Sequence, residues 1–377
     1  MLKESSKTNS PRFASKVFAL FALLGSLYAG TELILYFLLS IRFSEAQSIR
    51  PDPFGGISYK PNIINKLPGY VGRLGTDGYG FIHNGDSARI INKNDIFIHG
   101  GSTVEGRGSS SNNQTIAAQL EKCLNLQGDS RQVINVGFSG DTIIQQSQRL
   151  YGRVLIKYKP SLIIFLDGRN DAHTSTNLYY QPYAPNTGIH DIRESSLFEN
   201  LQPKLGTNIT VFIKRLKNRI QKEMRNSKKA SIDKSRIIYE SQAERSNKSS
   251  QVYLETSLNI SQHLNERNID FIHILQPYLT AESKSLTKTE EKLIEKYLNS
   301  FKEYKNNTFY SQENEYMSAL KNFYRKSQNG NNMKHFFSFQ DLFKNNTSTL
   351  YTDSVHYNDV GNKLIATKIC QLVLNRP

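Results

Sequence analysis

Five residues of this sequence carry the groups that acyl transfer requires: Ser102, Gly137, Asn170, Asp353 and His356. Cleavage of an ester through a covalent acyl-enzyme needs a nucleophile, a base that takes its proton and a third group that orients the base. We predict that Ser102 is the nucleophile, that His356 is the base and that Asp353 holds the other imidazole nitrogen. We also predict an oxyanion hole formed by the backbone N–H groups of Ser102 and Gly137 and the side-chain amide of Asn170.

Each short motif around these residues is weak evidence when taken separately. A Gly-Gly-Ser sequence after a strand is usually a plain turn, and an isolated Asp-x-x-His is usually a surface loop or a helix cap. Asn170-Asp171 alone would also be interpreted as a turn followed by a helix cap. The prediction therefore rests on where these motifs stand relative to the elements around them.

The motifs follow apolar runs that have the length and composition of buried strands. The predicted strands cover residues 95–99, 132–136, 161–166, 270–275 and 336–339. Helical patterns cover residues 114–124, 142–157, 249–266, 289–304, 313–327 and 358–374. This alternation predicts an α/β fold with a five-stranded parallel sheet and helices on both faces. Because ligands bind at the carboxyl ends of such strands, we expect all of the predicted site residues at one edge of the sheet.

In these motifs the sequence resembles the SGNH, or GDSL-like, hydrolase family. The matching blocks, in the order of the family, are Gly100-Gly101-Ser102, Asn135-Val136-Gly137, Gly168-Arg169-Asn170-Asp171 and Asp353-Ser354-Val355-His356. The resemblance covers about residues 95–172 and 268–374. It implies a flavodoxin-like three-layer α/β/α sandwich, and esterase, lipase, thioesterase or carbohydrate deacetylase activity that needs no metal or other cofactor. No grouping of His, Cys, Asp or Glu in the sequence has the spacing of a metal site.

Gly101 departs from the family, which usually has Asp immediately before the serine. This departure favours a catalytically silent glycan-binding or assembly protein that keeps the fold, whereas the intact triad residues favour chemistry. A third hypothesis is an O-acyltransferase, in which a sugar hydroxyl replaces water. Near the predicted site, we interpret Glu105 as a solvated or capping carboxylate, and His99 and His173 as residues that fill space or stabilise turns.

The N-terminal residues predict a membrane anchor. Residues 17–41 are apolar apart from Glu32 and a few small polar residues. As a helix this segment would be about 37 Å long, which is enough to cross a hydrocarbon core of about 30 Å. Because residues 1–16 carry four Lys or Arg, we predict a cytoplasmic tail there and an extracytoplasmic position for everything after the anchor. The alternative is a cleaved signal peptide with its apolar core over residues 17–29.

Beyond the anchor we predict a linking segment over residues 42–94, with a short strand or two around residues 78–82. One hydrolase-like domain should follow over residues 95–377, with an insertion at about 172–248 where the alternation of strands and helices is lost. The combined prediction is a single-pass membrane protein whose extracytoplasmic domain is a serine esterase. Its substrate would be an oxygen ester, an acyl or acetyl group on a glycan or a lipid.

The positive charge of the chain is concentrated in the predicted insertion. The formal net charge is +15, and ten of the 48 Lys and Arg residues lie between positions 214 and 236. Residues 210–225 form a basic amphipathic helical pattern. Such a helix either packs its apolar stripe on the core, or lies against anionic lipid or borders the substrate entrance. We expect no nucleic acid partner, since the domain is predicted to lie outside the cytoplasm.

The chain has two cysteines, Cys123 and Cys370. In the sandwich that the resemblance implies, the first and last helices usually share a face, and both cysteine-bearing helices start at the active edge. A disulfide between them is one hypothesis and two buried thiols are the other. A Cα separation above about 7 Å would exclude the bridge.

Overall fold

The structure is a computed structural model that describes residues 23, 26–31, 34, 48–52, 56–64, 71–72, 74–175, 242–279, 284–304 and 313–376. Contacts divide the chain into two units, one of residues 48–189 with 239–377 and one of residues 1–47 with 190–238. The first unit contains the sheet and all of the predicted site residues. The predicted basic helix over residues 210–225 lies outside the described residues.

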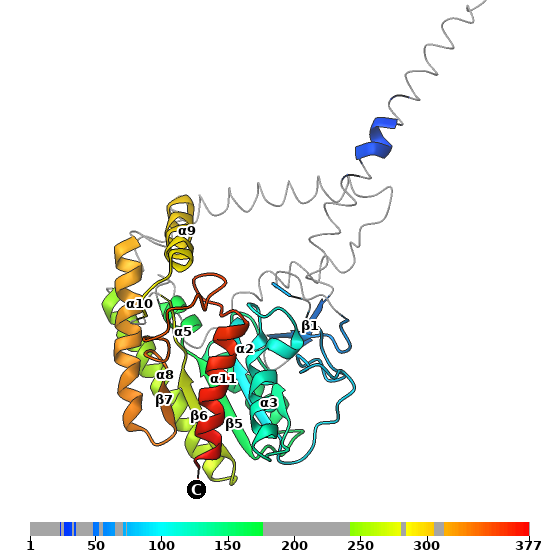
Figure 1. Cartoon of the computed structure of the whole chain (residues 1–377), viewed down its shortest axis with the longest axis vertical. Coiled ribbons are helices and arrows are strands. Elements are labelled where there is room, and N and C mark those ends of the chain that lie inside the picture. The colour runs from blue at the N-terminus through cyan, green and yellow to red at the C-terminus, as the bar shows by residue number, and fades with distance from the viewer. Residues whose placement is uncertain are drawn as a thin grey trace, which may run out of the picture. The chain divides into compact units, whose positions relative to one another are not determined.

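The core of the first unit is a five-stranded parallel sheet, as predicted (Figure 1). Its strands are β3 (Ile96–Gly100), β4 (Val133–Asn135), β5 (Leu162–Asp167), β6 (Asp270–Leu275) and β7 (Phe336–Ser338). They lie in the order β4-β3-β5-β6-β7, which is the flavodoxin-like order 2-1-3-4-5 when the strands are counted along the chain. The central strands β3 and β5 are buried along their whole length, which explains why they are continuous apolar runs in the sequence.

Helices cover both faces of the sheet, so that the unit has three layers. On one face α3 (Ile116–Leu126) and α11 (Asp359–Leu374) pack on a core that includes Ile164 and Leu166 of β5. On the other face α4 (Ile143–Arg149), α8 (Gln242–Asn265) and α10 (Glu313–Ser327) pack on a core that includes Ile163 and Phe165. Successive residues of β5 thus point to opposite layers, as the pleat of a strand requires.

Most predicted helices agree with the structure, and two differ in extent. The helix predicted over residues 142–157 is α4 followed by a π-helical turn at Leu150–Val154. Thr142 and Gln145 form a capping box at the start of α4. The helix predicted over residues 249–266 begins earlier, at Gln242 of α8. The remaining helical elements are α2 (Ser102–Glu105), η1 (Asn112–Gln114), α5 (Arg169–Ser175), α9 (Lys288–Tyr304) and η4 (Gln328–Asn332).

The segment before β3 contains two short strands, which form an antiparallel hairpin and lie earlier than the predicted residues 78–82. Its strands are β1 (Ile49–Asp52) and β2 (Gly56–Tyr59). The strand predicted near residues 78–82 is wrong. The side chain of Asp77 accepts hydrogen bonds from the backbone N–H groups of Tyr79 and Phe81, and Gly80 between them has φ of +81°. The chain therefore turns there instead of extending.

Only part of the predicted anchor falls within the described residues. Residues 23, 26–31 and 34 are helical, and the rest of the segment 17–41 lies outside the described residues. Among the residues that the structure describes, no helix has both the length and the apolar character needed to cross a bilayer.

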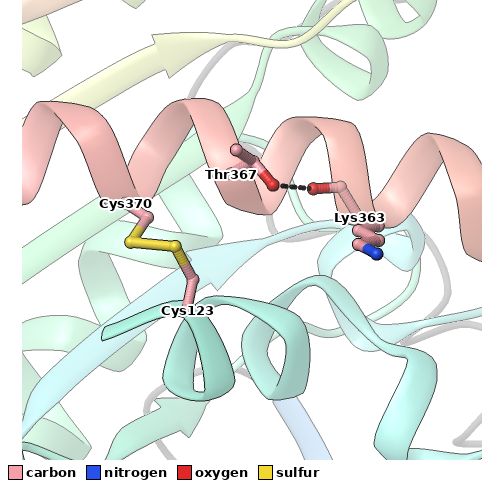
Figure 2. Close-up of a disulfide and its surroundings, with 4 residues drawn as sticks. All are labelled: Cys123, Lys363, Thr367 and Cys370. Atoms are coloured by element: carbon pink, nitrogen blue, oxygen red, sulfur yellow. Dashed lines mark hydrogen bonds between the residues drawn. A yellow bond between two sulfur atoms is a disulfide. The ribbon is translucent and has the colours of Figure 1, made fainter. Parts of the chain in front are cut away.

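Cys123 and Cys370 form a disulfide that joins α3 to α11, as Figure 2 shows. Their Cα atoms are 6.3 Å apart, within the range that a disulfide can bridge. The hypothesis of a bridge is therefore correct and that of two buried thiols is not. One turn before Cys370, Thr367 donates a hydrogen bond from Oγ1 to the carbonyl oxygen of Lys363 at 2.8 Å (Figure 2).

Candidate active site

Ser102 is the first residue of α2 and stands where the central strand β3 turns into that short helix. The turn is tight enough to exclude side chains before the serine. A Cβ atom on Gly100 would lie 2.5 Å from the carbonyl oxygen of Leu166, and one on Gly101 would lie 2.4 Å from Nδ2 of Asn170. The turn therefore holds the half-buried Ser102 hydroxyl at the carboxyl edge of the sheet, next to the Asn170 amide.

His356 and Asp353 lie on the loop before α11 and meet Ser102 at this edge. The Nε2 atom of His356 is 2.7 Å from Oγ of Ser102, and its Nδ1 atom is 2.6 Å from Oδ2 of Asp353. Because an ionised carboxylate can only accept hydrogen bonds, Nδ1 carries the proton and Nε2 accepts from the serine hydroxyl. The three residues assigned to the triad are thus brought together across 254 positions of sequence.

The Asp353 carboxylate also binds backbone groups of the loop on which it lies. Its Oδ1 atom accepts hydrogen bonds from the backbone N–H groups of Val355 and His356, at 2.7 and 2.8 Å. Partial burial raises the pKa of Asp353, but its hydrogen bond with His356, the imidazole charge and these backbone donors outweigh that effect and lower the pKa overall. The carboxylate is therefore ionised at neutral pH and holds the imidazole in one orientation.

Asn170 and Gly137 both lie at the site, but they differ in how their donors are used. Asn170 of α5 donates one hydrogen bond from Nδ2 to the carbonyl oxygen of Asp141 at 2.9 Å, and an amide group has a second proton on that nitrogen. Gly137 is buried, and its backbone N–H donates to Oδ1 of Asn135 at 3.0 Å. A Cβ atom on Gly137 would also lie 2.4 Å from the backbone nitrogen of Glu105. Gly137 thus permits close packing of its loop against α2.

Gly140 lies at the same edge and is not among the residues predicted from the sequence. It is exposed, has φ of +82°, and directly precedes Asp141, whose carbonyl oxygen accepts the Asn170 amide. The carboxylate of Asp141 is held in turn by the buried guanidinium of Arg149, with Nε to Oδ2 at 2.5 Å. The signal that could have found Gly140 is a glycine two residues before the Thr142 cap of α4, since only glycine adopts that conformation readily.

Glu105, at the end of α2, is completely buried, so its interpretation as a solvated or capping carboxylate is wrong. The Tyr59 hydroxyl donates to its Oε1 atom and the Ser139 hydroxyl donates to its Oε2 atom. Burial raises the pKa of Glu105 to about 8, although the hydrogen bond from Ser139 opposes this effect. An acidic group that holds its proton at neutral pH therefore lies three residues after the predicted nucleophile.

The two other histidines near the motifs are neutral. His99 on β3 is completely buried, its ring lies 5.0 Å from that of Phe165, and neither ring nitrogen has a hydrogen-bond partner. Burial lowers the pKa of His99 to about 3. These facts agree with the prediction that His99 fills space. Burial, together with the nearby charge of Arg169, also lowers the pKa of His173 to about 3.

A second Ser-His-Asp arrangement lies inside the protein, below the site. The Nε2 atom of His273 is 2.8 Å from Oδ1 of Asp167, and its Nδ1 atom is 2.6 Å from Oγ of Ser257. Tyr253 donates to the same Asp167 oxygen at 2.6 Å. Ser257 and His273 are completely buried, so no substrate can reach them. Since Asp167 ends β5 three residues before Asn170, this network fixes the strand end from which the Asn170 turn begins.

Within the described part of the chain, no group of three or more His, Cys, Asp or Glu side chains could hold a metal ion.

Comparison with known proteins gives a family match over most of the chain. The family profile of the GDSL-like Lipase/Acylhydrolase matches residues 76–369. No curated protein sequence matches the chain. Similar solved structures include the acetyl xylan esterase AlAXEase, with 13% identity, a TM-score of 0.37 and coverage of 74% of this chain and 99% of that chain.

Two further structures show similar values. The lipase/acylhydrolase from Enterococcus faecalis has 16% identity and a TM-score of 0.38, and the match covers 74% of this chain and 95% of that one. Axe2, an acetylxylan esterase from Geobacillus stearothermophilus, has 14% identity and a TM-score of 0.36, and the match covers 76% of this chain and 97% of that one.

Proposed function

Because the chain belongs to the GDSL-like lipase/acylhydrolase family and is an SGNH-type ester hydrolase, we propose that Ser102, His356 and Asp353 are its catalytic triad. The observation that carries this proposal is the unbroken line of hydrogen bonds from Oγ of Ser102 through both nitrogens of His356 to the Asp353 carboxylate, at 2.7 and 2.6 Å. The order of these groups is the one that nucleophilic acyl transfer needs.

In the proposed reaction, Oγ of Ser102 attacks the ester carbonyl carbon while Nε2 of His356 takes the hydroxyl proton. The imidazolium then faces the ionised Asp353 and returns its proton to the leaving alcohol as the carbon–oxygen bond of the ester breaks. A water molecule repeats the sequence on the acyl-Ser102 intermediate: His356 takes a proton from the water and gives it to Oγ as the acyl group leaves as an acid. The lowered pKa of Asp353 supports this role, since its charge is present throughout the neutral range.

The oxyanion hole that we propose differs from the predicted one at one position. Its donors are the backbone N–H groups of Ser102 and Gly140 and the second amide proton of Asn170. Gly137 is unsuited because it is buried and its N–H donates to Asn135. We choose Gly140 because it is exposed and directly precedes Asp141, whose carbonyl oxygen accepts the Asn170 amide. Asn170→Ala should lower kcat by a factor on the order of 10²–10³, the usual cost of one oxyanion donor.

We further propose that the substrate is an acyl or acetyl ester on a glycan or a lipid, and that the domain works outside the cytoplasm. Residues 1–16 would be the cytoplasmic tail, 17–41 the anchor, 42–94 the linking segment and 95–377 the hydrolase-like domain. The disulfide supports this location, because such bonds persist in oxidising compartments. The basic segment 210–225 would then face the membrane surface, where its charges suit anionic lipid.

The proposal is tested with the full chain in detergent and a short-chain nitrophenyl ester. Ser102→Ala should lower kcat by a factor of about 10⁴ or more. The matched control is Ser348→Ala, which changes an exposed serine and should leave kcat unchanged. Equal turnover by the Ser102 variant and the wild type would reject the triad.

The same assay separates the alternatives. If a sugar alcohol added to the reaction receives the acyl group in preference to water, the protein is an O-acyltransferase with the same triad. If neither hydrolysis nor transfer occurs with acyl esters of glycans, lipids or nitrophenol, the protein is the silent binding or assembly protein that Gly101 favours.

A further inference from the structure

The hairpin β1–β2 reaches the catalytic edge although it lies before residue 76, where the family match begins. The hydroxyl of Tyr59, the last residue of β2, donates to Oε1 of Glu105. The other oxygen of that carboxyl group accepts from the hydroxyl of Ser139. Glu105 belongs to the helix that begins at Ser102, and Ser139 precedes Gly140. One buried carboxyl group thus joins the hairpin, the nucleophile helix and the loop of the proposed oxyanion hole.

The hairpin holds the same loop by further contacts. The ring of Tyr59 lies 4.8 Å from that of Phe138. The guanidinium of Arg149 lies 4.4 Å above the Phe138 ring and donates to the carbonyl oxygen of Ile57 at 2.5 Å. Since Arg149 also binds Asp141, the loop of residues 137–141 contacts the hairpin and α4 as well as α2.

We propose that the β1–β2 hairpin is a positioning element of the active site, and that Tyr59, Glu105 and Ser139 act as positioning residues that set the place of the oxyanion loop relative to Ser102. The inference rests on the proposed roles of Ser102 and of the loop around Gly140. None of the three residues touches the reacting atoms in this account. They act through the backbone donors that they hold.

The hydrogen bonds of the Glu105 carboxyl group couple the hairpin to the position of the loop. Glu105 is completely buried, and a buried polar group must have its hydrogen bonds satisfied. Removing the Tyr59 hydroxyl leaves one carboxyl oxygen without that donor, so the carboxyl group and the loop that it holds have to rearrange. An error of about 1 Å in the position of catalytic groups can lower turnover on the order of 10²-fold. The effect should fall on kcat, because the oxyanion exists only during the reaction.

The protonation of Glu105 supplies a second readout. Burial raises its pKa to about 8, and the charged groups that face it are Arg107 after α2, Asp141 in the loop and Arg149 on α4. Below pH 8 the carboxyl group holds a proton. Above pH 8 it becomes a buried anion that can only accept hydrogen bonds, so the bonding between α2 and the loop changes. Glu105→Gln keeps the shape and a donor but does not ionise.

The first test compares kcat and KM of the full chain for a short-chain ester in three variants. Tyr59→Phe and Ser139→Ala should each lower kcat about 10- to 100-fold, with KM within twofold of the wild type. Ser139→Thr, which keeps the hydroxyl, should have a kcat close to that of the wild type. The matched control is Tyr79→Phe, which removes a tyrosine hydroxyl from the same N-terminal region and should change neither constant.

The second test is the pH profile of kcat from pH 6 to 10. The wild type should lose turnover above about pH 8, and Glu105→Gln should not, provided that the circular dichroism spectra of both proteins match. Unchanged kcat in Tyr59→Phe, or identical pH profiles of wild type and Glu105→Gln, would overturn the inference. Full activity of Ser102→Ala would instead reject the proposed triad, so a failure of the triad can be distinguished from a failure of the positioning role. If Tyr59→Phe does not fold, the Glu105→Gln profile alone decides the matter.

Discussion

Removal of the disulfide between Cys123 and Cys370 should reduce the stability of the fold without reducing its activity. The perturbation is the double variant Cys123→Ala/Cys370→Ala, or reduction of the wild type. The bridge links two residues that are 247 positions apart in the sequence. The segment between them contains β4, β5, β6 and β7. Breaking the bridge therefore increases the conformational entropy of most of the unfolded domain.

The magnitude follows from that separation. In the chain-entropy description, closing a loop of this length stabilises the folded state by about 5 kcal/mol at 25 °C. Measured losses on removing native disulfides are typically about 2–5 kcal/mol, so we expect a loss in that range and a fall in the melting temperature of roughly 5–10 °C. Turnover of the folded protein should remain, because Cys370 lies near the end of α11 while His356 precedes its start.

The assay is urea unfolding followed by far-UV circular dichroism, since the chain has no Trp to serve as a fluorescent reporter. The matched control is Thr367→Ala, which alters an exposed residue of the same helix one turn before Cys370 (Figure 2). Equal unfolding free energies for the oxidised wild type and the double variant would refute the reasoning. Two reactive thiols in the unreduced, denatured wild type would refute the bridge itself.

Three other predictions concern the site. Gly101→Asp introduces the residue that the family usually has there. It should lower kcat at least tenfold in an ester assay, because its Cβ atom would lie 2.4 Å from Nδ2 of Asn170. A gain in kcat would contradict this prediction. For Glu105, the folded protein keeps the proton up to about pH 8 while the ordinary pKa is 4.5, so the free energy of unfolding should fall as pH rises across that interval, on the order of 5 kcal/mol. Urea unfolding at pH 5 and pH 8 should show this fall in the wild type and not in Glu105→Gln. Asp353→Asn should lower kcat about 10⁴-fold. Because the pKa of Asp353 lies below its ordinary value, the carboxylate is charged throughout the neutral range, so the loss should be equally large at pH 6 and pH 8. A loss confined to acid would argue against its role.

The strands of the sheet and its ligand-binding edge were predictable because they depend on residues that are close together in the sequence. A buried parallel strand is a continuous apolar run, so β3, β5 and β6 could be located within a residue or two. The edge at which ligands bind then follows from topology alone. For the same reason Ser102, Asn170 and His356 could be placed together before their distances were known.

The features that were missed depend on contacts between distant residues. Nothing near Glu105 indicates that Tyr59, 46 positions earlier, covers it and that the carboxyl group is buried. That the N–H of Gly137 donates to Asn135 is likewise visible only in the folded loop. The pairing of the two cysteines depended on the relative placement of α3 and α11, which the resemblance alone left open.

The central claim is that Ser102 is the nucleophile, and the most direct test is to locate the covalent adduct. The full chain is treated with a fluorophosphonate, and the labelled peptide is identified by mass spectrometry. We predict one adduct per chain, on Ser102, and none on the Ser102→Ala or His356→Ala variants under the same conditions. An adduct on a different residue, or equal labelling of the Ser102→Ala variant, would contradict the account.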